Sequence, residues 1–588
     1  MENLIKGGEF LIRDYSSAGK YIPENINEDQ KLIRESVREF VSQVLRIEGG
    51  KLEKQPELVE QAADLGLIGA HIPEKYGGQE FDMVVNAIIN EELGAGDASF
   101  STTFGADTGI GMLPILYFGT EEQKLKYLPK LCSGAFKSSY CLTEPESGSD
   151  ALSAKTKAIL SADGQFYQLS GQKMWISNAG FADIFIVFAQ VDGDRFTGFI
   201  VEKGAQGMTL GEEEKKMGIK GSSTRQIFFD NCPVPVQNVL GEIGKGHLIA
   251  FNVLNMGRFK LGVLVSGGAK FVSSIAVNYA KERKQFDEPL SNFGAIKYKL
   301  AEMAIRSYVL ESSVYRIANH LDDWKADLSA KGETYENSVL ESAEEYAIEC
   351  AIAKIYGSET LDYVVDETVQ IHGGNGYSEE FLPAKIFRDS RINRIYEGTN
   401  EINRLLMVNM LFRRVLKGEL DMVGPAWEVQ KELAGMPKLE AVEGLFGQER
   451  KALKDAKKLL LMVAGAGAKY QMDGKIVLKD EQEVVMNIAD IMMHVFNMES
   501  VLTRLEELEN KQDELFEQKF SILKMYFHDA QFQLTHLATD ALSSFATGDE
   551  LKIMLMGVKR FTKYEPVNVR LHRRKIADAM ISAGAYPY

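Results

Sequence analysis

The sequence predicts a mainly helical α+β protein in which a β domain follows one helical domain and precedes two more. Apolar residues recur with helical spacing early in the chain and again from about residue 245, whereas short apolar runs bounded by turn residues lie between these regions. With 588 residues, about four times a typical domain length, the chain has room for several domains. The expected domains are residues 1–139, 140–245, 246–424 and 425–588.

The first domain is expected to be helical. Asn27 can cap a helix together with Gln30, and the apolar residues that follow fall on one helix face: Ile33, Val37, Phe40, Val41 and Val44. Further helices are predicted, with interruptions at Pro73, Gly77–Gly78 and Gly94–Gly96.

The spacing changes to that of strands from about Ala158. Turn residues such as Asp163–Gly164 bound a series of short apolar runs: Phe166–Leu169, Ile184–Ala189, Phe199–Val201 and Ile227–Phe229. We therefore expect a β domain in this part of the chain.

Long amphipathic patterns return after Pro235 and persist to about Lys417, for example at Leu300, Met303, Ala304 and Tyr308. The stretch from about Asp421 is again helical and contains no strand-like block. Gly424–Pro425 is the predicted boundary of this appended helical domain.

Charge and composition exclude several functions. The chain has 67 basic and 84 acidic residues and a net charge of -17, which argues against nucleic acid as a partner. The cysteines are too few and too scattered for a disulfide framework, which fits a reducing compartment: Cys132, Cys141, Cys232 and Cys350. The eight histidines form no metal-binding motif, so no metal site is expected.

The N-terminus, Met1–Asp14, lacks the features of a signal or transit peptide, and the longest apolar run, Leu459–Ala468, is too short to span a membrane. We therefore expect a soluble cytoplasmic protein of bacterial type. The last 38 residues carry eight basic and two acidic side chains, centred on Lys559–Lys575. This patch raises the alternative of peripheral contact with the inner membrane through the appended domain.

Three distant segments depart from ordinary core patterns. The first is the hydroxyl-rich loop Tyr140–Asp150, which is followed by Trp175-Ile176-Ser177 and can bond a heteroaromatic ring or a phosphate. The second is the glycine-rich stretch Gln370–Tyr377, and the third is Arg388–Glu401, which contains Glu397. Alone, each segment also fits a tight turn, a core tryptophan or a solvated carboxylate. No G-x-G-x-x-G motif follows a predicted strand, so a Rossmann site is not indicated.

Together these segments resemble the acyl-CoA dehydrogenase flavoprotein family. Cys141–Asp150 and Gln370–Asp389 resemble its two signature patterns, and the other family elements occur in the family's order: Trp175-Ile176-Ser177, Arg283–Phe286 and Tyr396–Thr399. The resemblance implies an N-terminal helical domain, a middle β-barrel and a C-terminal four-helix bundle. The appended domain, together with Leu254–Phe259 and Arg388–Ile395, makes the chain most similar to the very-long-chain branch.

The resemblance implies α,β-dehydrogenation of acyl-CoA thioesters to trans-2-enoyl-CoA in fatty-acid β-oxidation. Glu397 would be the catalytic base, FAD would accept the hydride at flavin N5, and an electron-transfer flavoprotein would receive the electrons. The residues implied to bind FAD, some across a subunit interface, are Tyr140, Leu142, Thr143, Ser149, Trp175, Ser177, Arg283, Phe286, Gln370, Gly373, Gly374, Thr399 and Glu401. The residues implied to contact substrate are Ser149, Asn255, Arg258, Tyr396 and Gly398.

The sequence also departs from the family pattern and leaves alternatives open. Asp287 and Lys297 replace a usual glycine and a frequent glutamine near the expected cofactor contacts. An acyl-CoA oxidase and an assembly or scaffold protein on the same fold are the rival functions. The appended domain is expected to leave a homodimer, with a tetramer as the alternative. The length and branching of the acyl chain stay open.

Overall fold

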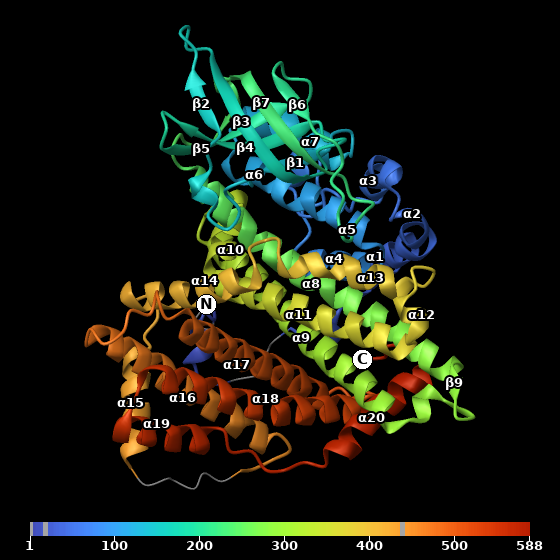
Figure 1. Cartoon of the computed structure of the whole chain (residues 1–588), viewed down its shortest axis with the longest axis vertical. Coiled ribbons are helices and arrows are strands. Elements are labelled where there is room, and N and C mark those ends of the chain that lie inside the picture. The colour runs from blue at the N-terminus through green and yellow to red at the C-terminus, as the bar shows by residue number, and fades with distance from the viewer. Residues whose placement is uncertain (1–3, 16–20, 436–441) are drawn as a thin grey trace.

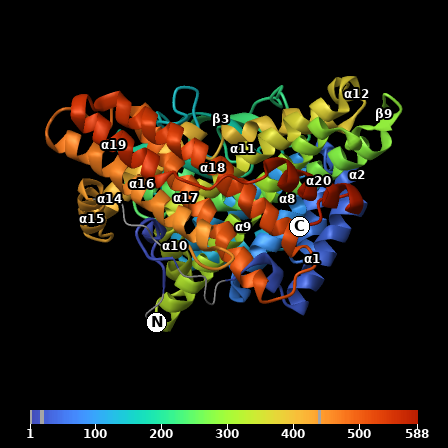
Figure 2. The ribbon, with the colours of Figure 1, turned by 90° about the horizontal axis from the view of Figure 1, so that it is seen from below.

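The computed structural model describes residues 4–15, 21–435 and 442–588. The molecule has three tiers, with the β domain at one end, a central tier of long helices, and the appended helices at the other end (Figure 1). Seen from below, the appended helices cover one side of the central tier (Figure 2). The predicted mainly helical α+β class is confirmed.

The N-terminal domain is helical as predicted. Asn27 and Gln30 form the expected capping box, in which each side chain accepts from the other residue's amide. The main helices of this domain are α1 (Glu28–Phe40), α2 (Arg46–Glu48), α3 (Gln55–Asp64), α4 (Met83–Gly94), α5 (Ala98–Gly105), α6 (Leu113–Phe118) and α7 (Glu121–Cys132). A π-helical turn, Ala106–Gly111, joins α5 to α6.

The middle domain is a mixed sheet of eight strands: β1 (Ser138–Cys141), β2 (Lys157–Leu160), β3 (Phe166–Ser177), β4 (Ile184–Val191), β5 (Arg195–Glu202), β6 (Met208–Leu210), β7 (Thr224–Pro235) and β8 (Val239–Leu240). The strand order is β6-β7-β3-β2-β4-β5-β8, and β1 pairs in parallel with β4. The apolar runs predicted as strands lie in β3, β4, β5 and β7. Among the described residues no pairing joins β6 to β8, so a sheet is confirmed but a closed barrel is not shown.

The central tier is built on three long helices that pack against one another, α8 (Gly246–Glu282), α9 (Gly294–Ala330) and α11 (Ala347–His372). Shorter elements surround them: β9 (Lys284–Gln285), β10 (Glu288–Pro289), α10 (Tyr335–Glu345), α12 (Gly374–Tyr377), α13 (Leu382–Ser390) and α14 (Asn400–Leu416). By length and composition α8 could cross a membrane, but 67% of its most apolar window is buried inside the protein, as in a core helix.

The appended domain contains α15 (Val423–Ala434), α16 (Gly447–Met472), α17 (Gln482–Glu509), α18 (Phe516–Phe545), α19 (Gly548–Phe561) and α20 (Val569–Ala583). Its core is the packing of α16, α17 and α18 on one another, and α17 and α20 contact α9. The predicted boundary residues Gly424–Pro425 lie in the first turn of α15, which begins at Val423.

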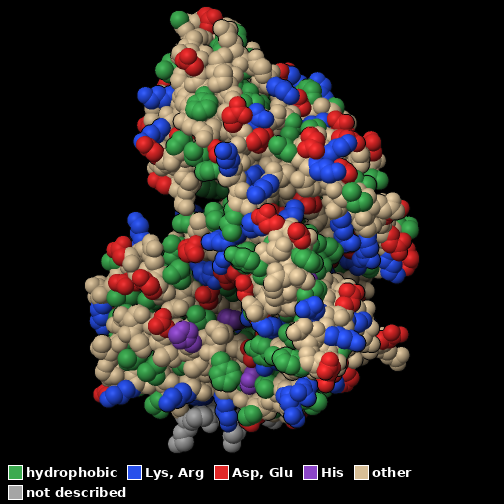
Figure 3. Space-filling view, turned by 45° about the vertical axis from the view of Figure 1, so that its right-hand side comes forward, with side chains coloured by type: hydrophobic (Ala, Val, Ile, Leu, Met, Phe, Trp, Pro, Cys, Tyr) green, Lys and Arg blue, Asp and Glu red, His purple; other side chains and the backbone are tan. Residues whose placement is uncertain are grey.

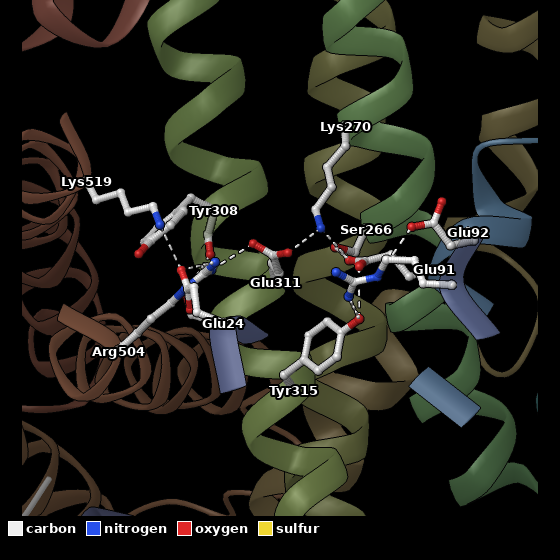
Figure 4. A network of polar contacts seen from close by, with 12 residues as sticks. Glu24, Glu91, Glu92, Ser266, Lys270, Tyr308, Glu311, Tyr315, Arg504 and Lys519 are labelled. Carbon is white, nitrogen blue, oxygen red and sulfur yellow. Dashed lines mark hydrogen bonds and ion pairs between the residues drawn. The ribbon is translucent and has the colours of Figure 1, made fainter. Parts of the chain in front are cut away.

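A buried network of ion pairs fastens the appended domain to the central tier (Figure 4). Arg504 of α17 donates to Glu311 of α9 (2.7 Å) and to Glu24 near the N-terminus (3.0 Å). Lys270 of α8 binds Glu311 from the other side and also donates to Glu91 of α4 (2.7 Å). One carboxylate of α9 therefore connects the appended domain with α8.

Part of the predicted basic patch is paired with acidic side chains of the same chain. Arg573 pairs with Glu302 (2.7 Å), Arg560 pairs with Glu432 (2.8 Å) and Lys575 pairs with Glu517 (3.1 Å). In the space-filling view, acidic and basic side chains are interspersed over the visible face (Figure 3).

Candidate active site

Glu397 lies in the turn that connects the 3-10 helix Arg391–Arg394 to α14. Glu397 has a φ of 58° and Gly398 a φ of 80°, so two successive residues are left-handed, which is uncommon for glutamate. Thr399 caps α14 by accepting a hydrogen bond from the amide of Ile402 (3.2 Å). A strained residue of this kind persists only where its surroundings hold it in place, as at functional sites.

The carbonyl groups of this turn are held by two side chains. Asn403 Nδ2 donates to the carbonyl oxygens of Glu397 (3.3 Å), Gly398 (2.8 Å) and Thr399 (3.0 Å). Lys354 Nζ, which comes from α11, donates to the carbonyl oxygen of Gly398 (2.7 Å). The backbone around Glu397 is therefore fixed from two helices.

Helix α8 supplies a third support. Arg258 Nε donates to the carbonyl oxygen of Glu397 (3.2 Å), and its Nη1 donates to Asn255 Oδ1 (2.9 Å). Both α8 residues are buried. Two residues predicted to contact substrate, Asn255 and Arg258, are thus brought to the turn that carries Glu397.

The carboxyl group of Glu397 rests against α8 at Gly257. A Cβ atom at position 257 would lie 2.7 Å from Glu397 Oε2, so a larger residue there would displace the carboxyl group. Oε2 is buried and has no hydrogen-bond partner among the described residues. Burial raises the pKa of Glu397 to about 7, although the positive charges of Arg258 and Lys354 oppose the rise.

Tyr140 of β1 brings the β domain to this site. Its hydroxyl group is buried and has no partner within the described ranges. Burial raises the pKa of the Tyr140 phenol, and the nearby charge of Glu397 adds to the rise. The amide of Glu397 also lacks an acceptor in the described part of the chain. Polar groups without partners at a buried site are free to bind a ligand.

An ion pair organises the hydroxyl-rich loop after Tyr140. Lys173 Nζ donates to Glu144 Oε1 (2.6 Å) and to the carbonyl oxygen of Leu142 (3.3 Å), and both charged side chains are buried. Glu144 also accepts from the amide of Thr156 (3.0 Å). Burial favours a higher pKa for Glu144, but the charge of Lys173 and the hydrogen bonds that Glu144 accepts lower it. The hydrogen-bonded carboxylate of Glu144 therefore holds the loop in place.

The end of β3 lies beside this loop and exposes an aromatic surface. The carbonyl of Thr143 accepts from the amide of Met174 (2.9 Å), and Ser139 Oγ donates to the carbonyl of Ser177 (2.8 Å). Trp175 is left-handed, with a φ of 61°, and 55% of the residue is exposed. The alternative that Trp175 is a core residue is therefore wrong. Ser149 is exposed in the same loop.

A cavity of about 140 Å³ adjoins the catalytic turn. Tyr396, next to Glu397, lines it, and Tyr396 Oη donates to Asn393 Oδ1 (2.6 Å). The remaining wall is mostly apolar and small side chains from α5, α8 and α13, including Thr102, Leu264, Val265, Gly268, Phe271, Leu382 and Ile386.

The other predicted cofactor residues lie elsewhere. Five of them gather where α8 and α11 end, around β9 and α12 (Figure 1): Arg283, Phe286, Gln370, Gly373 and Gly374. These two helix ends adjoin each other, since Tyr279 stacks on His372 with ring centroids 3.9 Å apart. Phe286 is 89% exposed. Thr399 and Glu401 lie at the start of α14.

Sequence reasoning missed several residues that shape the site: Gly257, Lys354, Asn400 and Asn403. One signal was available, because Lys354 is a charged residue inside the buried apolar stretch Ala347–Ile355. Gly257 precedes Arg258 directly but has no side chain to indicate a role. Asn403 follows Glu397 by six residues on α14, where nothing in the pattern distinguishes it from a surface amide.

Comparisons with known proteins find one family along most of the chain. Family models for the N-terminal, middle and C-terminal domains of acyl-CoA dehydrogenase match residues 27–135, 139–232 and 244–412, and a second model, also described as an acyl-CoA dehydrogenase C-terminal domain, matches residues 455–560.

Three similar proteins extend the comparison. A probable acyl-CoA dehydrogenase of Bacillus subtilis is 44% identical over 99% of this chain and 98% of its own length. The human mitochondrial very long-chain specific acyl-CoA dehydrogenase is 38% identical over 77% of this chain and 66% of its own. The crystal structure of an acyl-CoA dehydrogenase from Bacillus anthracis complexed with FAD has a TM-score of 0.95 at 42% identity and covers 99% of this chain and 100% of its own.

Proposed function

Because the chain belongs to the acyl-CoA dehydrogenase family, we propose that it oxidises acyl-CoA thioesters to trans-2-enoyl-CoA in fatty-acid β-oxidation, with Glu397 as the base. The observation that carries the proposal is the Glu397 carboxyl group, enclosed against Gly257 with one oxygen that has no partner in residues 4–15, 21–435 and 442–588. A carboxylate in this state can accept a proton from a carbon acid because little water competes for it.

The residues around Glu397 adjust how strongly it holds a proton. Burial raises the pKa of Glu397 to about 7, while Arg258 and Lys354 prevent a larger rise. At neutral pH the carboxyl group therefore exists in both forms in comparable amounts. It can take the α-proton of the substrate and release it afterwards.

The thioester oxygen needs a hydrogen-bond donor as the α-proton leaves. The amide of Glu397 has no acceptor among the described residues, and its left-handed conformation is fixed by Asn403 and Arg258. It can therefore donate to the thioester carbonyl without reorganisation, which is the arrangement that stabilises a developing oxyanion.

The cofactor is FAD, which when bound would supply the acceptor for the β-hydride, at flavin N5 by analogy with the family. The residues of this chain fit a flavin: Trp175 offers an exposed ring, and Tyr140 has a buried hydroxyl with no partner among the described residues. Leu142, Thr143, Ser149 and Ser177 would hold the ring system from the same loop and strand end.

The five predicted cofactor residues at the ends of α8 and α11 do not lie beside the loop Tyr140–Asp150, because they are at the other end of the long helices. We infer that Arg283, Phe286, Gln370, Gly373 and Gly374 complete the cofactor site of a second copy of the chain in a homodimer. The 89% exposed ring of Phe286 supports this reading, because a partner would cover it. Sedimentation of the purified flavoprotein would show a dimer, and a monomer that retains FAD would refute this reading.

Anaerobic mixing of the purified yellow protein with acyl-CoAs of increasing chain length tests the function. We expect bleaching of the flavin absorbance and a trans-2-enoyl-CoA product. A colourless protein that does not take up FAD, or a flavin that no acyl-CoA reduces, would contradict the proposal.

The same protein distinguishes a dehydrogenase from an oxidase. We propose that an electron-transfer flavoprotein reoxidises the flavin, as the family resemblance implies. Rapid reduction of that flavoprotein with slow peroxide release is the expected result. Peroxide release that keeps pace with enoyl-CoA formation would instead identify an oxidase.

We propose a cytoplasmic location with peripheral contact between the appended domain and the inner membrane. The support is a set of exposed apolar residues on two helices that both pack on α16: Val423, Trp427, Ile553 and Met556. Flotation with vesicles containing one third phosphatidylglycerol should recover the full chain, and an Ile553→Ser/Met556→Ser variant should bind less. Equal flotation of both proteins would contradict the contact.

A further inference from the structure

Helix α14, which begins with the catalytic turn, lies between the catalytic unit and the appended domain. It packs on α11 of the central tier and on α17 of the appended domain. The N-terminal end of α14 carries Thr399 and Asn400, directly after Glu397 and Gly398. A change in the position of α17 that shifts α14 would therefore act close to Glu397.

The relay begins at the turn itself. Lys354 Nζ donates to the carbonyl oxygen of Gly398 (2.7 Å) and to Asn400 Oδ1 (2.7 Å). Asn400 Nδ2 donates in turn to Glu359 Oε1 (3.0 Å) and to Ser358 Oγ (3.0 Å). Lys354 and Asn400 are both buried, so water would not compensate for the loss of these hydrogen bonds.

The relay continues through an arginine clamp to the appended domain. Arg404 of α14 binds both carboxylate oxygens of Glu359, at 2.8 Å through Nη1 and 3.0 Å through Nη2. Its Nε donates to Asp490 Oδ1 of α17 (2.7 Å). The guanidinium group of Arg404 therefore donates to a carboxylate of α11 through Nη1 and Nη2 and to a carboxylate of α17 through Nε. These bonds to two helices fix its orientation.

We propose that Asp490 of the appended domain is a positioning residue for catalysis, which holds the Glu397 turn in its reactive geometry through Arg404, Glu359, Asn400 and Lys354. This inference rests on the proposed role of Glu397 as base. Without Asp490, Arg404 keeps only Glu359 and can rotate, so the carboxylate to which Asn400 donates is no longer fixed. The left-handed turn then loses part of the support that its strain requires.

The structure provides a matched control on the same helix. Glu499 of α17 also faces the central tier and accepts from Arg316 Nη2 of α9 (2.5 Å). Glu499 pairs with Arg316 of α9 and with Lys457 of α16, and neither of these residues belongs to the relay. Glu499→Gln therefore weakens the same interface without entering the relay.

The first test measures the turn directly by hydrogen–deuterium exchange of the FAD-bound protein. Asp490→Ala should speed exchange of the amides in residues 395–403 several-fold, by loosening local structure. Asp490→Asn, which keeps an acceptor oxygen, should restore most of the protection. Glu499→Gln should leave these amides unchanged. Equal exchange in wild type and Asp490→Ala, or equal acceleration by Glu499→Gln, would overturn the proposal.

The second test uses kinetics. Asp490→Ala should lower kcat about tenfold with little change in KM, as expected when a reacting group is misplaced. If the two residues act through one relay, Asp490→Ala combined with Glu359→Gln should be no slower than the slower single variant. Multiplying effects would contradict the relay. The exchange experiment needs no turnover, so this proposal can fail while Glu397→Gln still identifies the base.

Discussion

Two buried glutamates in this protein experience similar loss of water and respond in opposite ways. Glu311 accepts hydrogen bonds from Arg504 and Lys270, and these cations lower its pKa despite burial (Figure 4). One oxygen of Glu397 has no partner in the part of the chain that the structure describes, and burial raises the pKa of Glu397 to about 7. Arg258 and Lys354 lie near it, but their hydrogen bonds go to the turn's backbone and to asparagine side chains rather than to its carboxylate.

The difference distinguishes a carboxylate that stabilises the fold from one that is proposed to take part in the reaction. In the Glu311 network every charge has a partner, so its protonation state is fixed and it joins the appended domain to α8 and α4. At Glu397 the nearby cations bond to the backbone and to asparagine side chains, which leaves the carboxyl group available for the proposed role as base.

The largest expected effect comes from removing the free carboxylate. Glu397→Gln keeps the shape of the side chain but cannot accept the α-proton. We expect kcat to fall by at least about 10³-fold, with FAD retained and the fold intact. Dye-coupled turnover and the flavin absorbance of the purified variant measure both. Activity within tenfold of wild type would show that Glu397 is not the base.

Removing the paired carboxylate should act on stability instead. Glu311→Gln leaves Arg504 with Glu24 and Lys270 with Glu91 as their remaining countercharges in the described part of the chain, and the free energy of unfolding should fall by about 3 kcal/mol. Urea denaturation measures the loss, while kcat of the folded protein should stay near normal. Asp549→Asn, which breaks the exposed pair with Lys552, should change nothing measurable. If Glu311→Gln were as stable as wild type, the network would not fasten the domains.

A methyl group added at position 257 tests the position of the Glu397 carboxyl group. Gly257→Ala places a Cβ atom 2.7 Å from Glu397 Oε2 and must displace the carboxyl group. We expect kcat to fall by about 10- to 100-fold with a smaller change in thermal stability. Gly465→Ala in α16 is the control, because an added Cβ atom there would meet only Ala426 Cβ at 3.7 Å, an ordinary van der Waals contact. Unchanged kcat in Gly257→Ala would place the reacting oxygen elsewhere.

The smallest expected effect is a pair of opposite pH dependences. The folded-state pKa of Glu397, about 7, lies above its ordinary 4.5, so the folded protein holds this proton more tightly and loses stability as pH rises from about 4.5 to 7. The stability advantage of Glu397→Gln over wild type should therefore grow across that window. Glu311 has a lowered pKa, so its stabilisation is present above its ordinary value and disappears as pH falls below it. Parallel curves for both variants would contradict the comparison.

The sequence predicted the order of the domains because helical and strand periodicities are local signals. The capping box at Asn27 and the strand runs in β3 to β7 depend on neighbours a few residues away, and the structure confirms them. The environment of Trp175 was harder to predict, because a single tryptophan in a sequence fits a protein core as well as a ligand-binding face. Its left-handed conformation, which exposes the ring, follows from an irregular β3–β7 pairing.

The support of the active site was not predictable in the same way. Lys354, Asn403 and Gly257 act on Glu397 across three different helices, and their relation exists only after α8, α11 and α14 have packed. The link to Asp490 is more remote still, since 93 residues separate it from Glu397 in the chain. Such contacts leave no periodic pattern, so only coordinates reveal them.

The central claim is that Glu397 moves the α-proton, and proton exchange tests it apart from oxidation. A 3-thia-acyl-CoA cannot lose a β-hydride, so in heavy water the FAD-bound protein should only exchange its C2 hydrogen. We predict deuterium at C2 with wild type, detected by mass spectrometry, and none above the uncatalysed rate with Glu397→Gln. Equal incorporation by both proteins would contradict the assignment of Glu397 as the base.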